Sequence, residues 1–387
     1  MVSTQSIGSD EVPILGDGVV TLRAHRPDDT DRIIAHARDP QMQRWTQVPV
    51  PYGRRDAEQF LATAAANWAT GRAFSFAIHA EDGFAGSMDL RPLGDGAAEI
   101  GYALAPWARG RRVMSRALRI CLRWGFEDRG LEVVQWRAQV GNWPSRRVAW
   151  ACGFRVEGTV RGLLAHRSRR EDGWIGTLRR EDPMTPAHAW FDPPVLTDGP
   201  LALRPHQISD LPDIVEACQD VETQRWLDIP HPYSEEDAVR HLTRVREQQA
   251  SGRGLYWIVA DAGSSQLKGE IGLFVRDDSG RHGEVGYWAH PRSRRRGAIS
   301  SATRLVVRHA LLPRDVGGLG MDRVLLRAAA ANHASQRVAE RVGFVRAGLD
   351  RNAGRARDGT LHHDIRFDLL PDDLPVAPDD LRTADGP

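Results

Sequence analysis

The stretch EIGYALAPWARGRRVMSRA, residues 99–117, decides the fold, because the chain repeats it as EVGYWAHPRSRRRGAISSA at residues 284–302. Both copies begin with an alternating, strand-like segment, pass through an arginine-rich turn, and end in the start of an amphipathic helix. Such a turn is an anion cradle, because the free backbone N–H groups and the dipole of a helix N-terminus favour negative charge. A solvated basic turn is the alternative interpretation.

The repeat extends over most of the chain. Arg44 returns as Arg225 at an offset of 181 (225 − 44), and Gly153 returns as Gly343 at an offset of 190 (343 − 153). The offset only grows along the chain, as loop insertions between matched elements would produce. So long a period indicates a duplicated domain and is far too long for a solenoid repeat.

Composition excludes several classes of protein. The 387 residues carry 52 Lys+Arg and 51 Asp+Glu, a net charge of +1, so no global field would hold nucleic acid or a membrane surface. Lys268 is the only lysine, so anion contacts are expected from guanidinium groups. Three cysteines are too few for a disulfide framework. With no signal peptide and no apolar run near ~20 residues, we expect a soluble cytoplasmic protein.

Proline-rich composition marks the domain boundaries. Residues 181–200 contain five prolines, which is typical of a linker. We predict an N-terminal domain at 14–182, a linker at 183–198, a C-terminal domain at 199–371 and a disordered acidic tail at 372–387. Within each copy, strands in a meander precede a crossover helix and further strands, which predicts an α/β unit with a mixed sheet.

With these features in this order, each copy resembles the GNAT acyltransferase superfamily, whose members transfer acyl groups from acyl-CoA to amines. The branch it resembles most acetylates the N-termini of ribosomal proteins. The resemblance covers about residues 18–180 and 199–370 and implies two tandem domains, each with a mixed, V-splayed β-sheet flanked by helices. In the first copy it rests on Thr21-Leu22-Arg23, Arg44-Trp45, Glu99-Ile100-Gly101-Tyr102, Arg109-Gly110-Arg111, Asn142-x-x-Ser145 and Gly153-Phe154.

The family implies a cradle of the form Arg-x-x-Gly-x-Gly/Ala, whose glycines let the backbone approach the CoA pyrophosphate. In the first copy Arg112 and Met114 fill both glycine positions, whereas the second copy keeps Gly297 and has Ile299 at the last position. A side chain at such a position obstructs the ligand. We therefore expect acetyl-CoA to bind as co-substrate in the second copy, with the first as a scaffold, unless Arg112 gives its guanidinium to a phosphate.

The expected cofactor contacts follow from this alignment. In the second copy they are Ala289, Arg294, Arg295, Arg296, Gly297, Ala298, Ile299, Ser300 and Asn332, and the counterparts in the first copy are Arg109, Gly110, Arg111, Arg112 and Asn142. The two asparagines also suit helix N-caps, which is the competing interpretation. We expect no metal, because no set of ligands stands at metal-binding spacing.

Attack of an amine on a thioester needs a neutral amine, a stabilised oxyanion and a proton for the departing thiolate. The resemblance implies that Glu284, or Glu99 in the first copy, accepts the amine proton, and a salt bridge to arginine is the equal alternative. It places an oxyanion-binding N–H near Ala289 or Leu104. Ser335, or Ser145, would donate to the thiolate. The family reacts by direct attack in a ternary complex, without a covalent acyl-enzyme.

The acceptor is predicted to be the primary amine of a small molecule or a peptide. Trp226, which follows Arg225 in the expected loop over the acceptor, and Tyr233 are the predicted acceptor contacts, with a core or interface tryptophan as the alternative. Because neither cradle is intact, a non-catalytic CoA- or ligand-binding pseudoenzyme is a second hypothesis. An acyltransferase with a different acyl donor is a third. The identity of the acyl group and the choice between monomer and homodimer stay open.

Overall fold

The computed structural model describes residues 11–355 and 359–374, and the chain divides into two compact units between Ala187 and His188. This division lies inside the stretch expected to be a linker. The last part of that stretch, however, belongs to the second unit, because residues 196–198 form a strand of its sheet and Trp257 Nε1 donates to the Pro194 carbonyl at 2.7 Å. The predicted disordered tail begins too early, because Pro371–Asp373 form a 3-10 helix and Leu374 packs against the core of the second unit. Residues 375–387 of the predicted tail lie outside the described residues.

The first unit contains one eight-stranded sheet in the order β1-β2-β3-β4-β5-β6-β8-β7. Its elements are β1 (Leu15–Gly16), β2 (Thr21–Arg23), α1 (Thr30–Ala37), α2 (Pro40–Trp45), α3 (Arg54–Ala69), β3 (Phe74–Ala80), β4 (Gly83–Gly94), β5 (Ala97–Leu104), α4 (Val113–Glu127), β6 (Val133–Gln139), α5 (Trp143–Ala151), β7 (Arg155–His166) and β8 (Arg169–Arg179). Among the strands described in this unit, only β5 and β6 pair in parallel, and the crossover helix α4 joins them. The predicted meander and crossover are therefore present.

The second unit repeats this sheet in the order β15-β16-β14-β13-β12-β11-β10-β9. Its elements are β9 (Leu196–Asp198), β10 (Leu201–Arg204), α6 (Leu211–Gln219), α7 (Val221–Trp226), α8 (Glu235–Ala250), β11 (Gly254–Asp261), β12 (Leu267–Val275), β13 (His282–Ala289), α9 (Ala298–Leu311), β14 (Arg323–Ala329), α10 (His333–Val342), β15 (Val345–Arg355) and β16 (Leu361–Leu369). The prediction of two tandem α/β domains with mixed sheets is confirmed.

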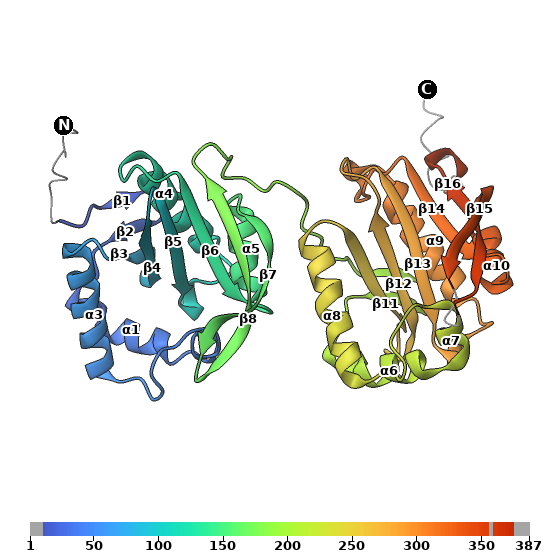
Figure 1. The fold of residues 1–387 in the computed structure, drawn as a ribbon, viewed down its shortest axis with the longest axis horizontal. Helices are drawn as coiled ribbons and strands as arrows, with labels where there is room; N and C mark the ends of the chain where they lie inside the picture. The colour runs from blue at the N-terminus through green and yellow to red at the C-terminus, as the bar shows by residue number, and fades with distance from the viewer. Residues whose placement is uncertain (1–10, 356–358, 375–387) are drawn as a thin grey trace, which may run out of the picture. The chain divides into compact units, whose positions relative to one another are not determined.

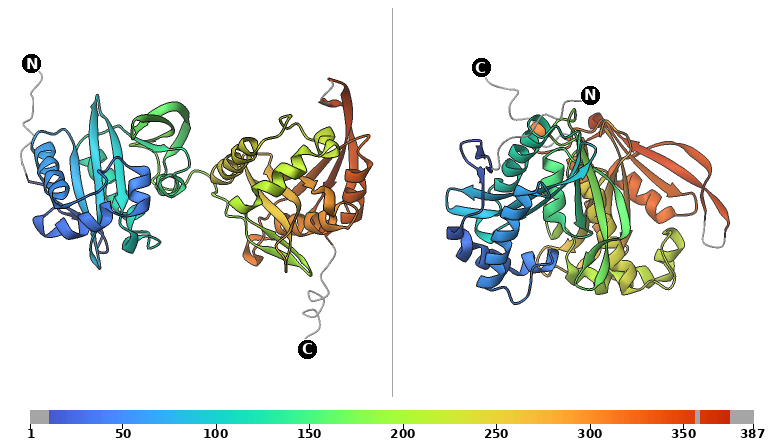
Figure 2. Two further views of the ribbon diagram at one scale, coloured as in Figure 1. Left: turned by 90° about the horizontal axis from the view of Figure 1, so that it is seen from below. Right: turned by 60° about the vertical axis from the view of Figure 1, so that its left-hand side comes forward.

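Helices cover both faces of each sheet, as Figure 1 and Figure 2 show. In the first unit one core lies between the sheet and the buried face of α4, and a second core lies under α1 and α3. The second unit likewise has one core under α9 and α10 and another under α6 and α8. The apolar stripe of α4, with Met114, Ala117, Leu118 and Cys121 all buried, follows the helical spacing seen in the sequence.

The parallel strand pair at the centre of each sheet opens into a V. Pairing between β5 and β6 ends at Ile100 and Trp136, although β5 continues to Leu104. In the second unit, pairing between β13 and β14 ends in the same way at Val285 and Leu326. The backbone beyond these points faces an opening instead of a neighbouring strand. No helix of the described ranges is long and apolar enough to cross a membrane.

Candidate active site

The turn before α4 and its counterpart before α9 have the same backbone conformation. Arg112 and Gly297 are the residues that precede the two helices, with φ of 58° and 81°. Two residues earlier, Gly110 and Arg295 also have positive φ, of 75° and 63°. Each cradle therefore needs two left-handed residues, a conformation that favours glycine, and each copy supplies one glycine and one arginine.

Some cradle arginines are already engaged by carboxylates. Arg109 donates to Asp39 (Nη2 to Oδ2, 2.6 Å), the residue that caps α2. In the same way Arg294 donates to Asp220, the cap of α7, and its guanidinium holds the pKa of that carboxyl below the usual value. In the structure these side chains tie the cradle to the short helix beside it. Arg112, Arg295 and Arg296 form no ion pair with any residue of the described ranges, so their guanidinium groups are the free cations of the cradles.

The last cradle positions are occupied by core side chains. Ile299 is 9% exposed and packs in the core under α9, and Met114 is 4% exposed in the core under α4. Of the other predicted contacts, Ala298 begins α9 and Ser300 is buried in its first turn. Ile299 therefore packs against the sheet, whereas Met114 also lines a cavity.

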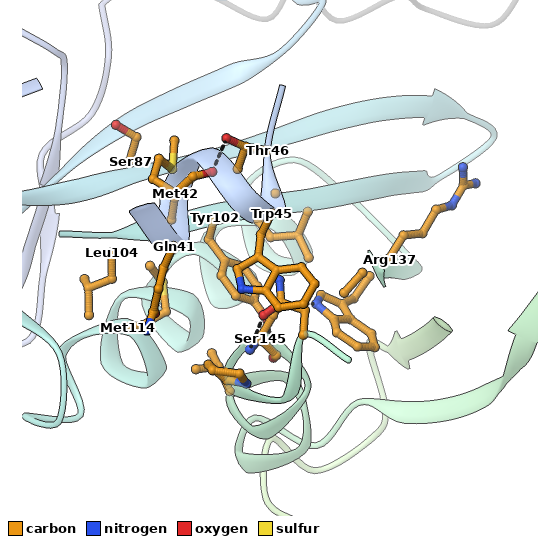
Figure 3. Close-up of a pocket in the computed structure, with 18 of the residues that line it drawn as sticks. Gln41, Met42, Trp45, Thr46, Ser87, Tyr102, Leu104, Met114, Arg137 and Ser145 are labelled. Carbon is orange, nitrogen blue, oxygen red and sulfur yellow. Dashed lines mark hydrogen bonds between the residues drawn. The ribbon is translucent and has the colours of Figure 1, made fainter. Parts of the chain in front are cut away.

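A cavity of about 770 Å³ in the first unit joins the cradle to the V opening. Its wall includes cradle residues, the ends of the splayed strands and the start of α5: Gly101, Tyr102, Ala103, Leu104, Arg109, Gly110, Arg112, Val113, Met114, Ser115, Trp136, Arg137, Asn142 and Ser145. Figure 3 shows the Trp45 indole pointing into this cavity, with Tyr102 and Ser145 beside it. Arg44 stacks over this indole, 4.6 Å from the ring centre.

A tyrosine contacts the candidate serine in both units, and the sequence analysis did not propose it. The Tyr287 hydroxyl lies 2.9 Å from Ser335 Oγ, and the Tyr102 hydroxyl donates to the Ser145 carbonyl at 2.9 Å. Burial raises the pKa of Tyr287 to about 12, so its hydroxyl stays protonated at neutral pH. Strand alternation places this tyrosine on the α10 side of the sheet, which is the signal that could have identified it.

Asn332 acts as the cap of α10, because its Oδ1 accepts the N–H of Ser335 at 3.1 Å. Asn142 does the same for Ser145 at 3.3 Å. The helix-cap interpretation is therefore confirmed for both asparagines, and the cap fixes the serine at the first turn of its helix. A direct cofactor contact by either asparagine stays a prediction.

Each candidate glutamate lies between two arginines. Glu284 accepts from Arg276 (Nε to Oε2, 2.8 Å) and from Arg327 (Nε to Oε1, 3.0 Å). Glu99 has the same arrangement in the first unit, with Arg91 at 2.7 Å and Arg137 at 3.2 Å. The structure thus shows the ion pairs that were the alternative to a base. In both units the carboxylate oxygens that would accept the amine proton already accept hydrogen bonds or ion-pair contacts from guanidinium groups.

Backbone N–H groups face the V opening where the oxyanion is expected. The N–H of Ala105 donates to β4 at 2.8 Å, and because antiparallel pairs alternate, the N–H of Leu104 points the other way, toward the opening. In the second unit the N–H of His290 donates to β12 at 2.9 Å, so that of Ala289 faces the opening. The oxyanion role of these two groups stays a prediction.

The second unit has a cavity of about 650 Å³ on the other face of its sheet, under α8. Tyr233, one of the two predicted acceptor contacts, lines it and is 4% exposed. Trp226, the other, is not among its lining residues and donates instead to Glu222 Oε1 at 2.8 Å. The cavity reaches the splayed strand at Gly286, Tyr287 and Trp288, and its wall includes Glu270 and His241, which the sequence analysis did not propose.

Comparison with known proteins agrees with this geometry. A family model described as "Acetyltransferase (GNAT) domain" matches residues 20–155 and again residues 201–345. These matches cover well over half of the chain, which therefore belongs to the GNAT acetyltransferase family, a family of acetyl-CoA-using enzymes, and carries two tandem copies of its domain. The resemblance stated from the sequence is confirmed.

Individual relatives match one domain at a time. The protein named "Putative ribosomal N-acetyltransferase YdaF" of Bacillus subtilis (strain 168) is 31% identical over 149 residues, which is 37% of this chain and 74% of that protein. Mycobacterium smegmatis RimJ, solved with a CoA disulfide, is 23% identical and covers 44% of this chain and 87% of its own, with a TM-score of 0.40. RimL, a ribosomal-protein acetyltransferase solved with coenzyme A, is 18% identical, covers 46% and 98%, and has a TM-score of 0.41.

Proposed function

We propose that the chain transfers an acetyl group from acetyl-CoA to the free amino group of a peptide, by direct attack in a ternary complex. The observation that carries this proposal is an arrangement that both units share: a left-handed turn at a helix N-terminus, a parallel strand pair that splays apart, and a serine in the first turn of the following helix. A helix N-terminus suits a pyrophosphate. A peptide amine is supported by the names of the relatives, which include a ribosomal N-acetyltransferase.

The chemistry assigned to each group follows from its position. The pyrophosphate would bind the N–H groups at the start of the cradle helix, and the acyl carbonyl oxygen would accept a hydrogen bond from the N–H of Leu104 or Ala289. Ser145 or Ser335, supported by its neighbouring tyrosine, would donate a proton or hydrogen bond to the CoA sulfur.

We propose that the second unit carries out the reaction. It keeps Gly297, which leaves the approach to the N-terminus of α9 open, and its cavity under α8 contains the titratable side chains that proton transfer needs. The first unit is the second candidate, because there a single cavity connects the cradle to the V opening. A third possibility is that the chain binds acetyl-CoA without turnover.

Two matched substitutions in the full chain distinguish these candidates, since each unit retains one cradle glycine. Gly297→Arg copies Arg112 into the second unit, and Gly110→Arg copies Arg295 into the first. Calorimetry with acetyl-CoA should show that Gly297→Arg loses binding while Gly110→Arg retains it. The reverse result would transfer the site to the first unit.

Turnover is measured separately, with a hexapeptide carrying a free N-terminal serine and mass spectrometry of the product. The same peptide with a blocked N-terminus is the control, because it offers no terminal amine. Acetylation of the free peptide alone supports the proposed function. Acetyl-CoA binding without acetylation of peptide or small primary amines would support the non-catalytic alternative.

A further inference from the structure

The cavity under α8 contains a buried carboxylate between two imidazoles. Glu270 Oε2 lies 3.0 Å from His206 Nε2 and 2.9 Å from His241 Nε2. Glu270 is 5% exposed, so its charge is out of water and these imidazoles are its polar neighbours. Three separate elements provide the cluster: the segment after β10, the helix α8 and the strand β12. Glu270 and His241 line the cavity, whereas His206 does not.

The hydrogen bonds fix which nitrogen of His241 carries a proton. Arg244, one turn further along α8, has its Nη2 3.0 Å from His241 Nδ1. A guanidinium can only donate, so Nδ1 accepts, and the hydrogen of the neutral ring is on Nε2, where it is donated to Glu270. The result is a carboxylate–imidazole pair in which the carboxylate orients the ring and the other ring nitrogen holds a lone pair.

This tautomer argues against a metal at the cluster, although the three ligand atoms lie within 4.8 Å of one another. A metal would need the lone pair of His241 Nε2, which is occupied by a proton in this arrangement. The ligating ring would then carry its hydrogen on Nδ1, where it usually donates to an acceptor. Here the group at Nδ1 is the Arg244 guanidinium, which offers no acceptor for that hydrogen.

The contact between Arg244 and His241 indicates which kind of ligand the lone pair of Nδ1 can accept. It lines the cavity with His241, and its side chain is exposed, so it can swing into solvent without leaving a charge buried. The guanidinium is a cation that donates N–H to Nδ1, and an alkylammonium has the same charge and the same donor. Aromatic rings of the cavity wall, from Tyr256, Phe274 and Trp288, suit a cation by their π faces.

The pair also lies beside the strand that the thioester would reach. Glu270 pairs across the sheet with Trp288, and the next residue is Ala289, whose N–H faces the V opening. The cavity reaches Gly286, Tyr287 and Trp288 on this strand. The cavity therefore brings an amine bound at His241 to the strand that contains Ala289.

We propose, on the basis of the function proposed above, that His241 accepts the proton of the acceptor ammonium in the second unit and that Glu270 is its positioning residue. The ammonium R–NH₃⁺ replaces Arg244 at Nδ1 and gives one proton to that nitrogen. The amine nitrogen then forms the N–C bond to the acyl carbon as the C–S bond breaks. The second proton lost from nitrogen goes to the CoA sulfur, so N-acetylated product and CoA thiol leave.

The groups facing the pair act on the pKa of His241 in opposite directions. Burial would lower the pKa of His241, but the Glu270 carboxylate outweighs it and raises the pKa. Burial would also raise the pKa of Glu270, but the two imidazoles that donate to it lower it. The other titratable groups around the pair are Cys218 from α6, Tyr233, Asp237 and Arg240 near or on α8, and Tyr256 from β11.

The first unit provides a comparison within the same chain. At the offsets of the repeat, Phe60 stands in the place of His241 and Ser87 in the place of Glu270, while His25 corresponds to His206. His25 Nε2 lies 3.1 Å from Ser87 Oγ, and Phe60 stacks edge-on against the His25 ring. The fold therefore does not need the pair, since an apolar ring and a hydroxyl fill the same positions.

The first experiment needs neither acetyl-CoA nor a known acceptor. Nuclear magnetic resonance of the full chain with ¹⁵N-labelled histidine identifies the tautomer of His241, and n-butylammonium is the probe. We expect the Nε2–H tautomer in the neutral ring and a shift of Nδ1 when the probe is added, with tighter binding in Arg244→Ala. An Nδ1–H tautomer, or shifts of both His206 and His241 on addition of Zn²⁺ alone, would overturn the proposal.

The second experiment uses the free-serine hexapeptide and the full chain. His241→Gln should lower kcat by about 10²–10⁴-fold with little change in the KM of the peptide. Glu270→Gln should move the acidic limb of the pH–rate profile to lower pH, because the carboxylate no longer raises the pKa of His241. Arg244→Ala should lower the KM of the peptide. Unchanged kcat in His241→Gln would overturn the proposal.

The two experiments separate this proposal from the function on which it rests. If the wild-type chain acetylates no amine while n-butylammonium still shifts His241, the transferase function of the second unit fails and His241 stands as an amine-binding group. If turnover is normal and neither His241→Gln nor the probe has an effect, the transferase function stands and the assignment of His241 is wrong.

Discussion

Arg112 and Gly297 occupy the same place in the two repeats, and both adopt the left-handed backbone conformation directly before a helix. This conformation costs a residue with a side chain roughly 1–2 kcal/mol. The first unit accepts that cost at Arg112, so the turn itself does not require glycine. A Cβ at Gly297 would meet no atom within 4 Å, which leaves an open approach to the start of α9. The difference between the units is therefore one of ligand access rather than of folding.

Gly297→Arg should abolish acetyl-CoA binding to the second unit while leaving the fold intact. A side chain in the approach removes hydrogen bonds between backbone N–H groups and the pyrophosphate, each worth about 1.5–3 kcal/mol. Loss of two lowers the affinity by about 10²–10⁴-fold. The positive charge of the new arginine would contribute only about 0–1 kcal/mol of attraction to the pyrophosphate, which does not compensate for this loss. Calorimetry measures the affinity and circular dichroism the fold.

Gly297→Ala is the control, because it adds a Cβ without the bulk of arginine and should weaken binding far less. The reverse change, Arg112→Gly, should create weak binding in the first unit, where Met114 still lines the cavity. If Gly297→Arg binds acetyl-CoA as tightly as the wild type, the cradle is not at α9.

Glu284→Gln should reduce stability more than activity. The substitution removes the charge that holds Arg276 and Arg327, and hydrogen bonds to charged groups contribute about 1.5–3 kcal/mol. Because the carboxylate is fully engaged, we expect kcat to fall less than about tenfold. A loss of about 10²–10⁴-fold would instead establish Glu284 as the base.

Glu99→Gln in the first unit is the matched control for Glu284→Gln, since the same two arginines are repeated there. Urea unfolding should give a similar loss of stability in both variants. Steady-state kinetics with the free-serine hexapeptide then shows whether only the second-unit variant affects turnover.

The first unit should lose stability as the pH falls from 6.5 toward 4. His36 is 4% exposed, and burial, reinforced by the Arg109 guanidinium, lowers its pKa to about 4. Between these values the unfolded chain binds a proton that the folded chain does not, so the free energy of unfolding falls with pH. The full effect is roughly 3 kcal/mol. Burial lowers the pKa of His25 to about 4 as well, with the same sign.

Urea unfolding followed from pH 7 to pH 4 measures this dependence. His36→Ala copies Ala217, the residue of the second repeat, and removes one titrating group. The variant should be less stable at pH 7 because a buried ring is lost, but its stability should fall less steeply with pH. Equal slopes in the variant and the wild type would contradict the prediction.

The sequence predicted the features that depend on local pattern or on the repeat. The meander, the crossover helix and the caps Asn142 and Asn332 follow from periodicity and from residue types that act within one turn. The equivalence of Arg112 and Gly297 follows from the repeat alone, and the backbone angles agree with it.

Contacts between distant elements could not be predicted in the same way. The pair of Tyr287 and Ser335 joins a strand to a helix 48 residues further along, and no local spacing connects them. The group of His206, His241 and Glu270 comes from three elements, and two of its members differ in type from their counterparts in the first repeat. Comparing the repeats for changes of residue type, rather than for matches, would have identified these positions.

The last prediction concerns a buried ion pair that both units contain. Arg23 binds Asp29 through two hydrogen bonds of 2.8 and 2.7 Å, and their side chains are 10% and 6% exposed. Asp29 also accepts the N–H of Arg26 at 2.9 Å, which closes the turn into α1. Arg204 and Asp210 repeat the arrangement in the second unit.

Asp29→Ala should therefore destabilise the first unit by about 3–5 kcal/mol, because it leaves a guanidinium buried without its partner. Asp210→Ala should do the same in the second unit. Asp31→Ala is the control, since Asp31 forms an ion pair of similar length with Arg54 but is 83% exposed, and it should cost less than about 1 kcal/mol. Urea unfolding of the three variants measures the difference. Equal losses for Asp29→Ala and Asp31→Ala would show that burial does not set the contribution of this pair, since the two ion pairs differ chiefly in their exposure to water.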